Sequence, residues 1–70
     1  MMPLSMVNVG DVNIIKKITG RDDVRKRLAD MGFVVGEEVT VVNQLGGNLI
    51  LSIKCCRVAL DQSLATRIMV

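Results

Sequence analysis

The feature that most restricts the fold of this chain is a pair of glycines, Gly32 and Gly36, on either side of Phe33-Val34-Val35. A helical pattern ends just before the first glycine, and a β-branched run starts soon after the second. Glycine adopts a positive φ without the penalty that a Cβ brings, so it commonly follows the last residue of a helix. The block therefore predicts a helix that reverses at Gly32 and a tight turn at Gly36 that leads into a strand.

The helix before this reversal is expected over residues 22–31, because Val24, Leu28 and Met31 recur at helical spacing. If the first glycine lies just beyond the helix end, the apolar contact that accompanies such an ending joins Phe33 to Leu28. Phe33 is also the only aromatic residue of the chain. We therefore expect it to be the largest side chain of an otherwise aliphatic core.

The start of this helix carries two acidic residues that suit the positive end of a helix dipole. Either Asp22 or Thr19 is expected to be the N-cap. Asp22/Lys26 and Asp23/Arg27 have the i,i+4 spacing and the order that favour ion pairs on a helix surface. This surface is predicted to be solvated and laced with salt bridges.

The rest of the chain reads as short strands, bounded by turn residues, over 12–18, 39–42, 49–54, 57–60 and 68–70. In the first strand, Val12, Ile14 and Ile18 are expected to share one face, with Lys16 out of step. Asp61 and the residues after it are expected to cap one more short turn. About five short strands and one inserted short α-helix predict a mainly β fold, a small and partly open antiparallel barrel that forms a single domain over 1–70.

The composition argues against an enzyme. The chain has no histidine, tyrosine or tryptophan, and it has no catalytic triad, phosphate loop or dinucleotide fingerprint. Its nine basic and seven acidic residues give a formal charge of +2, which permits a nucleic-acid partner without demanding one. No apolar run approaches the roughly 20 residues that span a bilayer, so a cytoplasmic protein is expected. We also expect that the protein requires no cofactor.

Cys55 and Cys56 are adjacent and cannot connect distant parts of the chain. They are weak candidates for binding a soft metal, because a structural metal site usually takes four ligands and no histidine is present to complete one. Free thiols are the expected state.

The surface that contacts a partner is expected on the helix and on a hairpin tip, because the strands are committed to the core. On the helix, Arg25 and Lys26 point away from the apolar face. The hairpin tip is the predicted turn that consists of Gln44, Leu45, Gly46, Gly47 and Asn48. Both regions are expected to tolerate substitution, and the tip to tolerate shortening, at little cost in stability.

The order of these features resembles the FeoA family of bacterial ferrous iron transport. The resemblance covers nearly the whole chain. It rests on Leu4-Ser5, Val9-Gly10-Asp11, the block from Arg27 to Val39, Arg57-Val58-Ala59-Leu60 and Ala65-Thr66-Arg67-Ile68-Met69-Val70. The chain departs from the family pattern at Val35, where many relatives have proline, and at Cys55, where glycine is frequent.

The resemblance implies a src-homology-3-like fold and a non-enzymatic accessory of FeoB, the ferrous iron permease with a cytosolic GTP-binding domain. It implies a cytoplasmic protein held at the inner face of the membrane by this partner, with family-level association of iron through unknown ligands. Two alternatives remain open, a small nucleic-acid-binding barrel and a regulatory domain of iron-dependent transcription control.

Overall fold

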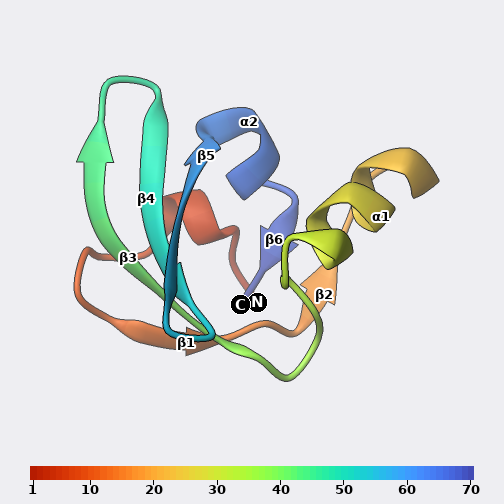
Figure 1. Cartoon of the computed structure of the whole chain (residues 1–70), viewed down its shortest axis with the longest axis horizontal. Helices are drawn as coiled ribbons and strands as arrows, with labels where there is room; N and C mark the ends of the chain where they lie inside the picture. The colour runs from red at the N-terminus through yellow and green to blue at the C-terminus, as the bar shows by residue number, and fades with distance from the viewer.

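A computed structural model describes residues 1–70, which form six short strands, two α-helices and one 3-10 helix (Figure 1). In chain order the elements are η1 (Leu4–Met6), β1 (Val12–Ile14), β2 (Lys17–Ile18), α1 (Asp22–Asp30), β3 (Glu38–Leu45), β4 (Asn48–Ile53), β5 (Cys56–Asp61), α2 (Gln62–Ala65) and β6 (Ile68–Met69). Neither α-helix is long and apolar enough to cross a lipid bilayer.

The strands form two antiparallel sheets. One has four strands in the order β1-β3-β4-β5, and the other pairs β2 with β6. The ends of the chain meet, because the Met2 N–H donates to the Val70 carbonyl at 2.8 Å and the Val70 N–H donates back at 2.9 Å (Figure 1). The predicted mainly β, partly open fold is confirmed, with six strands in place of about five and no closed barrel.

The predicted strand over 12–18 is wrong as a single element. The chain changes partners at Ile15, whose N–H donates to the Glu37 carbonyl and whose carbonyl accepts from the Gly36 N–H. One residue later, the Lys16 N–H donates to the Met69 carbonyl at 2.8 Å. The first half therefore joins the four-stranded sheet as β1, and the second half joins the other sheet as β2.

The faces of this segment also differ from the prediction. Val12 and Ile14 are 62% and 45% exposed, whereas Ile15 is 1% exposed and belongs to the core. The period of two breaks because the change of partners brings Ile15 inward. Ile18, partly buried, packs against the core as expected.

Helix α1 begins without either predicted cap. Its N-cap is Arg21, an extended residue whose side chain makes no capping hydrogen bond. Thr19 is too far back to cap and uses its hydroxyl to donate to the Arg67 carbonyl at 3.0 Å. Asp22 is already helical, and its carboxylate accepts from the Arg25 guanidinium. The cap prediction is therefore wrong.

The predicted i,i+4 ion pairs of α1 are also wrong. Asp22 pairs with Arg25, three residues on, rather than with Lys26. Asp23 pairs with the capping arginine, whose Nε lies 3.8 Å from Oδ1, rather than with Arg27. These pairs lie on a highly exposed surface, where an ion pair contributes little to stability.

The predicted reversal at the end of α1 is confirmed. Gly32 has φ +101°, its N–H donates to the Ala29 carbonyl, and the Phe33 N–H donates to the Leu28 carbonyl, both at 3.0 Å. This pair of bonds defines a Schellman ending. Leu28 and Phe33 are both fully buried, so the exit of the helix points into the core.

Two hairpins lie at opposite ends of β4. Gly46-Gly47 forms the loop between β3 and β4, as predicted, and Lys54-Cys55 forms the loop between β4 and β5. Lys54 and Cys55 both have positive φ, +50° and +63°. This is the geometry of a type I′ turn, which favours asparagine and glycine, so two residues that carry a Cβ are held here in a conformation that glycine adopts more readily.

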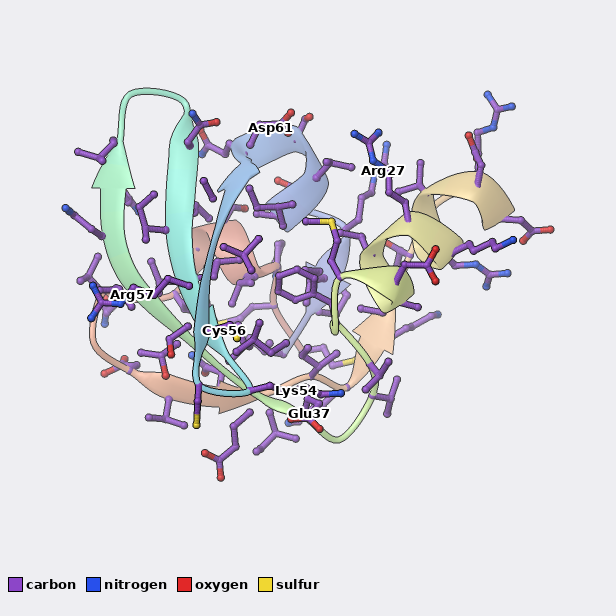
Figure 2. The ribbon with its side chains drawn as sticks, viewed as in Figure 1. Arg27, Glu37, Lys54, Cys56, Arg57 and Asp61 are labelled. Carbon is purple, nitrogen blue, oxygen red and sulfur yellow. The ribbon has the colours of Figure 1, made fainter.

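The predicted cap after β5 is confirmed. An Asp61 carboxylate oxygen accepts from the Leu64 N–H at 2.9 Å and from the Ser63 hydroxyl at 2.6 Å. The bond from Ser63 is the main cause that holds the pKa of Asp61 below its ordinary value of 3.8. Arg27, on the facing side of α1, adds a smaller electrostatic effect in the same direction (Figure 2).

A single aliphatic core lies between the sheets and the helices, with Phe33 as the largest fully buried side chain, as predicted. The core takes residues from nearly every element, and its members are Leu4, Val7, Ile15, Leu28, Phe33, Val39, Val41, Leu49, Leu51, Ile53, Leu60, Ala65, Ile68 and Val70. No polar or charged residue is buried.

Candidate functional site

An open groove of about 720 Å³ lies between β2, α1 and the loop that follows α1. These segments come together on one side of the molecule, to the right in Figure 1. We call this feature the α1 groove. It is bounded by lysines of β2 and the residue before it, by the outer surface of α1, and by Phe33-Val34-Val35.

The floor of the α1 groove is apolar and is formed by Ile18, Ala29, Phe33, Val34 and Val35. Phe33 is fully buried and supports the floor from below, whereas Val34 and Val35 are 37% and 65% exposed. Two neighbouring valines exposed beside a concave surface can be covered by a partner with a gain in apolar burial. The floor is therefore a place where a partner's side chain can be desolvated.

The rim of the α1 groove is basic, with Lys16, Lys17, Arg25, Lys26 and one acid, Asp22. Asp22 is engaged by Arg25, so the rim has a net charge of +3. The whole chain has nine basic and seven acidic residues, so five basic and six acidic residues (nine less four, seven less one) remain outside the rim. The positive charge of this protein is thus concentrated at the α1 groove.

The local sequence explains why the valines stay at the surface. After the Schellman ending, the Val34 N–H donates to the Gly32 carbonyl and the Glu37 N–H donates to the Val34 carbonyl, both at 3.1 Å. Gly36 has φ +94° and turns the chain toward β3. The two tight turns hold Val34 and Val35 in a short loop, where their side chains line the groove and stay exposed.

The structure separates the two parts of the predicted partner surface. Arg25 and Lys26 lie on the rim of the α1 groove. Residues 44–48 form the tip of the β3–β4 hairpin, at the upper left of Figure 1, on the other side of the molecule from α1. They line no groove together, so one small partner segment cannot contact both.

The expectation that the tip can be shortened at little cost stays a prediction, and one backbone hydrogen bond of the tip bears on it. The Gly47 carbonyl accepts from the Gln62 N–H at 2.9 Å, and Gln62 is the first residue of α2. Asn48 is paired with Asp61, the cap of that helix. The tip therefore holds the start of α2, although Leu45 is 58% exposed and its side chain is free to change.

Cys55 and Cys56 are free and exposed, one in the β4–β5 turn and the other at the start of β5. A second, more polar hollow lies beside Cys55, where the Lys54 ammonium is 3.8 Å from the Glu37 carboxylate (Figure 2). The fold gathers no cluster of three or more histidine, cysteine, aspartate or glutamate side chains there or elsewhere in residues 1–70. Neither cysteine has the neighbours of a metal site.

Of the ten residues that line the α1 groove, sequence reasoning placed only Arg25 and Lys26 on a partner surface. It missed the contribution of β2 and of the loop after α1, namely Lys16, Lys17, Ile18, Val34 and Val35. A signal was present at both places. Lys16 interrupts the alternation of the first apolar run, and an adjacent pair of valines enclosed by glycines has no room to place both side chains in a core. Each signal is local, whereas the groove exists only because tertiary contacts bring β2 beside α1.

The fold defines a class: a small, mainly β domain with an SH3-like architecture, which here carries an open groove with an apolar floor and a basic rim. The chain belongs to the FeoA family, because the model of the FeoA domain matches residues 2–70.

Individual relatives agree with this assignment. A Methanocaldococcus jannaschii protein assigned provisionally as Fe(2+) transport protein A is 34% identical over 70 residues, which are 100% of this chain and 85% of that protein. The crystal structure of Stenotrophomonas maltophilia FeoA complexed with zinc, described as a prokaryotic SH3 domain protein, superposes with a TM-score of 0.85 at 29% identity, over 99% of this chain and 88% of that one.

A third relative joins two proteins in one chain. The Fe(2+) transport protein A/Fe(2+) transporter FeoB fusion protein of Porphyromonas gingivalis is 46% identical over 41 residues. These residues are 59% of this chain and 5% of the fusion protein.

Proposed function

We propose that this chain is a non-catalytic accessory of ferrous iron uptake that binds the cytosolic, GTP-binding part of a FeoB-type permease. Family membership supports the role in iron transport, since relatives are named for it. The fusion of a related segment to FeoB supports the choice of partner, because fused domains act at high effective concentration on each other. The chain would then be held at the inner face of the membrane by its partner.

The observation that carries the proposal is the α1 groove itself. It combines an apolar floor, two exposed valines and a basic rim on elements fixed by hydrogen bonds. A binding surface on such elements loses little conformational entropy when a partner docks. No other part of residues 1–70 offers a hollow with a mainly apolar lining, since the second hollow has a single hydrophobic lining residue.

Iron is the cargo of the permease under this proposal, and the accessory needs no ion of its own to bind its partner. Cys55 and Cys56 supply two exposed thiols, fewer than the ligands that a soft metal takes in a structural site. A partner subunit could complete such a site only if it brought the remaining ligands. We therefore assign the chain's role to protein contact.

Calorimetry with the purified cytosolic part of the permease tests this function directly. The chain is titrated into that part in the presence of GDP and, separately, of a GTP analogue that is not hydrolysed. Saturable binding in at least one nucleotide state is expected. Absence of binding in both states, with both proteins folded, would reject the proposed function.

The alternative of a nucleic-acid-binding barrel has weaker support. The rim supplies cations for phosphates, but the only aromatic residue, Phe33, is fully buried and cannot stack on a base. A titration with single-stranded RNA over a range of salt concentrations separates the two functions, because binding to phosphates weakens steeply as salt rises.

A further inference from the structure

We infer that the α1 groove binds a short acidic segment of its partner that is anchored by one or two small aliphatic side chains. This inference rests on the proposed function for the identity of the partner. The chemistry of the segment follows from charge and shape alone. The groove sets cations on both sides of an apolar floor, and a complementary ligand therefore has acids on both sides of an apolar anchor.

The two sides of the rim come from different elements. Lys17 is the first residue of β2 and Lys16 directly precedes it, whereas Arg25 and Lys26 belong to α1. Only Arg25 is engaged in an ion pair, so the other three cations have no acidic partner within the protein. A segment with carboxylates on both sides of its anchor would pair with these cations without breaking an existing contact.

The floor selects the type of anchor. The groove is open, and its exposed floor residues are Ala29 and the β-branched Val34 and Val35, with the half-buried Ile18 beside them. An aliphatic side chain such as leucine or valine covers such a floor. A planar base or a sugar would leave the valines partly exposed and would find no aromatic surface, since Phe33 is buried.

An acid already present in the groove allows a substitution that should raise the affinity for an acidic segment. Asp22 lies on the rim and holds the Arg25 guanidinium. Its carboxylate therefore competes with carboxylates of a bound segment for that guanidinium. Asp22→Asn should bind an acidic segment more tightly than the unmodified chain, an effect opposite in sign to anything that general damage to the fold would produce.

The experiment titrates a capped synthetic peptide, in which glutamates surround a pair of leucines, into the full chain. Calorimetry measures the affinity. Lys26→Glu is expected to lower the affinity roughly tenfold, because it replaces an attraction by a repulsion. Its matched control is Arg57→Glu, an exposed charge reversal on β5, outside the groove, which should change the affinity less than about twofold. Asp22→Asn is expected to raise the affinity about threefold.

The apolar anchor is tested with a matched pair of valines. Val35 is 65% exposed in the groove, and Val12 is 62% exposed on β1, outside it. Val35→Ser is expected to lower the affinity for the peptide about fivefold, and Val12→Ser to leave it unchanged. A peptide with lysines in place of the glutamates should bind to none of these proteins.

The outcomes separate this inference from the proposed function. If the permease part binds equally well to the unmodified chain, Lys26→Glu and Val35→Ser, the function stands and the inference fails. If the permease part does not bind at all while the peptide binds as described, the groove chemistry stands and the proposed partner fails. If vesicles of phosphatidylglycerol or single-stranded RNA compete for the rim and the acidic peptide does not bind, the inference is overturned.

Discussion

The α1 groove and the β3–β4 hairpin tip are equally plausible partner surfaces by exposure, and they differ in everything else. The groove is concave, has an apolar floor and carries a net charge of +3. The tip is convex and carries no charged side chain in residues 44–48. Exposure alone makes both regions candidate partner surfaces, whereas shape and charge favour only the groove.

The two regions also differ in how freely their loops can change without disturbing the rest of the fold. The tip, with its two glycines, looks like the more adaptable region, yet its Gly47 carbonyl holds the first residue of α2. The exposed valines of the groove, in contrast, make no such contact, but the loop that presents them depends on Gly32. The glycine-containing tip is therefore connected to α2, whereas the rigid turn after α1 is the region that presents exposed apolar side chains.

The largest expected effect concerns the two glycines of these regions. Gly32→Val should lose about 1–3 kcal/mol of unfolding free energy, because valine opposes a φ of +101°, although a Cβ there would meet only the Lys54 Cδ at an ordinary contact distance of 3.8 Å. Gly47→Val is the control, since Gly47 has no positive φ and has open space around a Cβ. Urea denaturation measures both, and equal losses would refute the role of the Schellman ending.

A smaller effect is expected at the other end of β4, where the turn contains no glycine. Cys55→Gly should gain about 0.5–1 kcal/mol, because glycine relieves the positive φ of +63°. Cys56→Gly should lose a similar amount, since Cys56 is paired with Ile53 within the ladder. Thermal unfolding under reducing conditions checks the opposite signs. A loss of stability in Cys55→Gly would contradict the type I′ assignment.

The smallest effect concerns the cap that supports the tip through α2. The folded pKa of Asp61 is lowered, so its contribution is fully present above the unfolded value of 3.8 and is lost as pH falls through the folded value. Asp61→Asn should therefore be slightly less stable near neutral pH, and the difference should shrink at pH values below about 3.8. Melting temperatures of both proteins over this range test the sign. A difference that grows on acidification would contradict it.

Local signals explain what the sequence predicts well. The Gly32 reversal, the Asp61 cap and the Gly46-Gly47 loop each depend on a few adjacent residues, and all three appear in the structure. The buried position of Phe33 follows from its being the only aromatic side chain in a small core. Such features need no knowledge of distant contacts.

Distant contacts explain what the sequence did not predict. The division of the first apolar run depends on Ile15, which bonds to the residues before β3, and on Lys16, which bonds to β6. The cap of α1 differs because Thr19 is held by Arg67. The groove could not be predicted for the same reason, since its lysines become rim residues only when β2 lies beside α1.

The central claim is that the partner binds at the α1 groove and not at the hairpin tip. The most direct test is a nuclear magnetic resonance titration of the isotope-labelled chain with the cytosolic part of a FeoB-type permease. The account predicts that amide signals of Ile18, Lys26 and Val35 shift or broaden first, while those of Gln44 to Asn48 stay in place. Perturbation of the tip signals with the groove signals unchanged would contradict it.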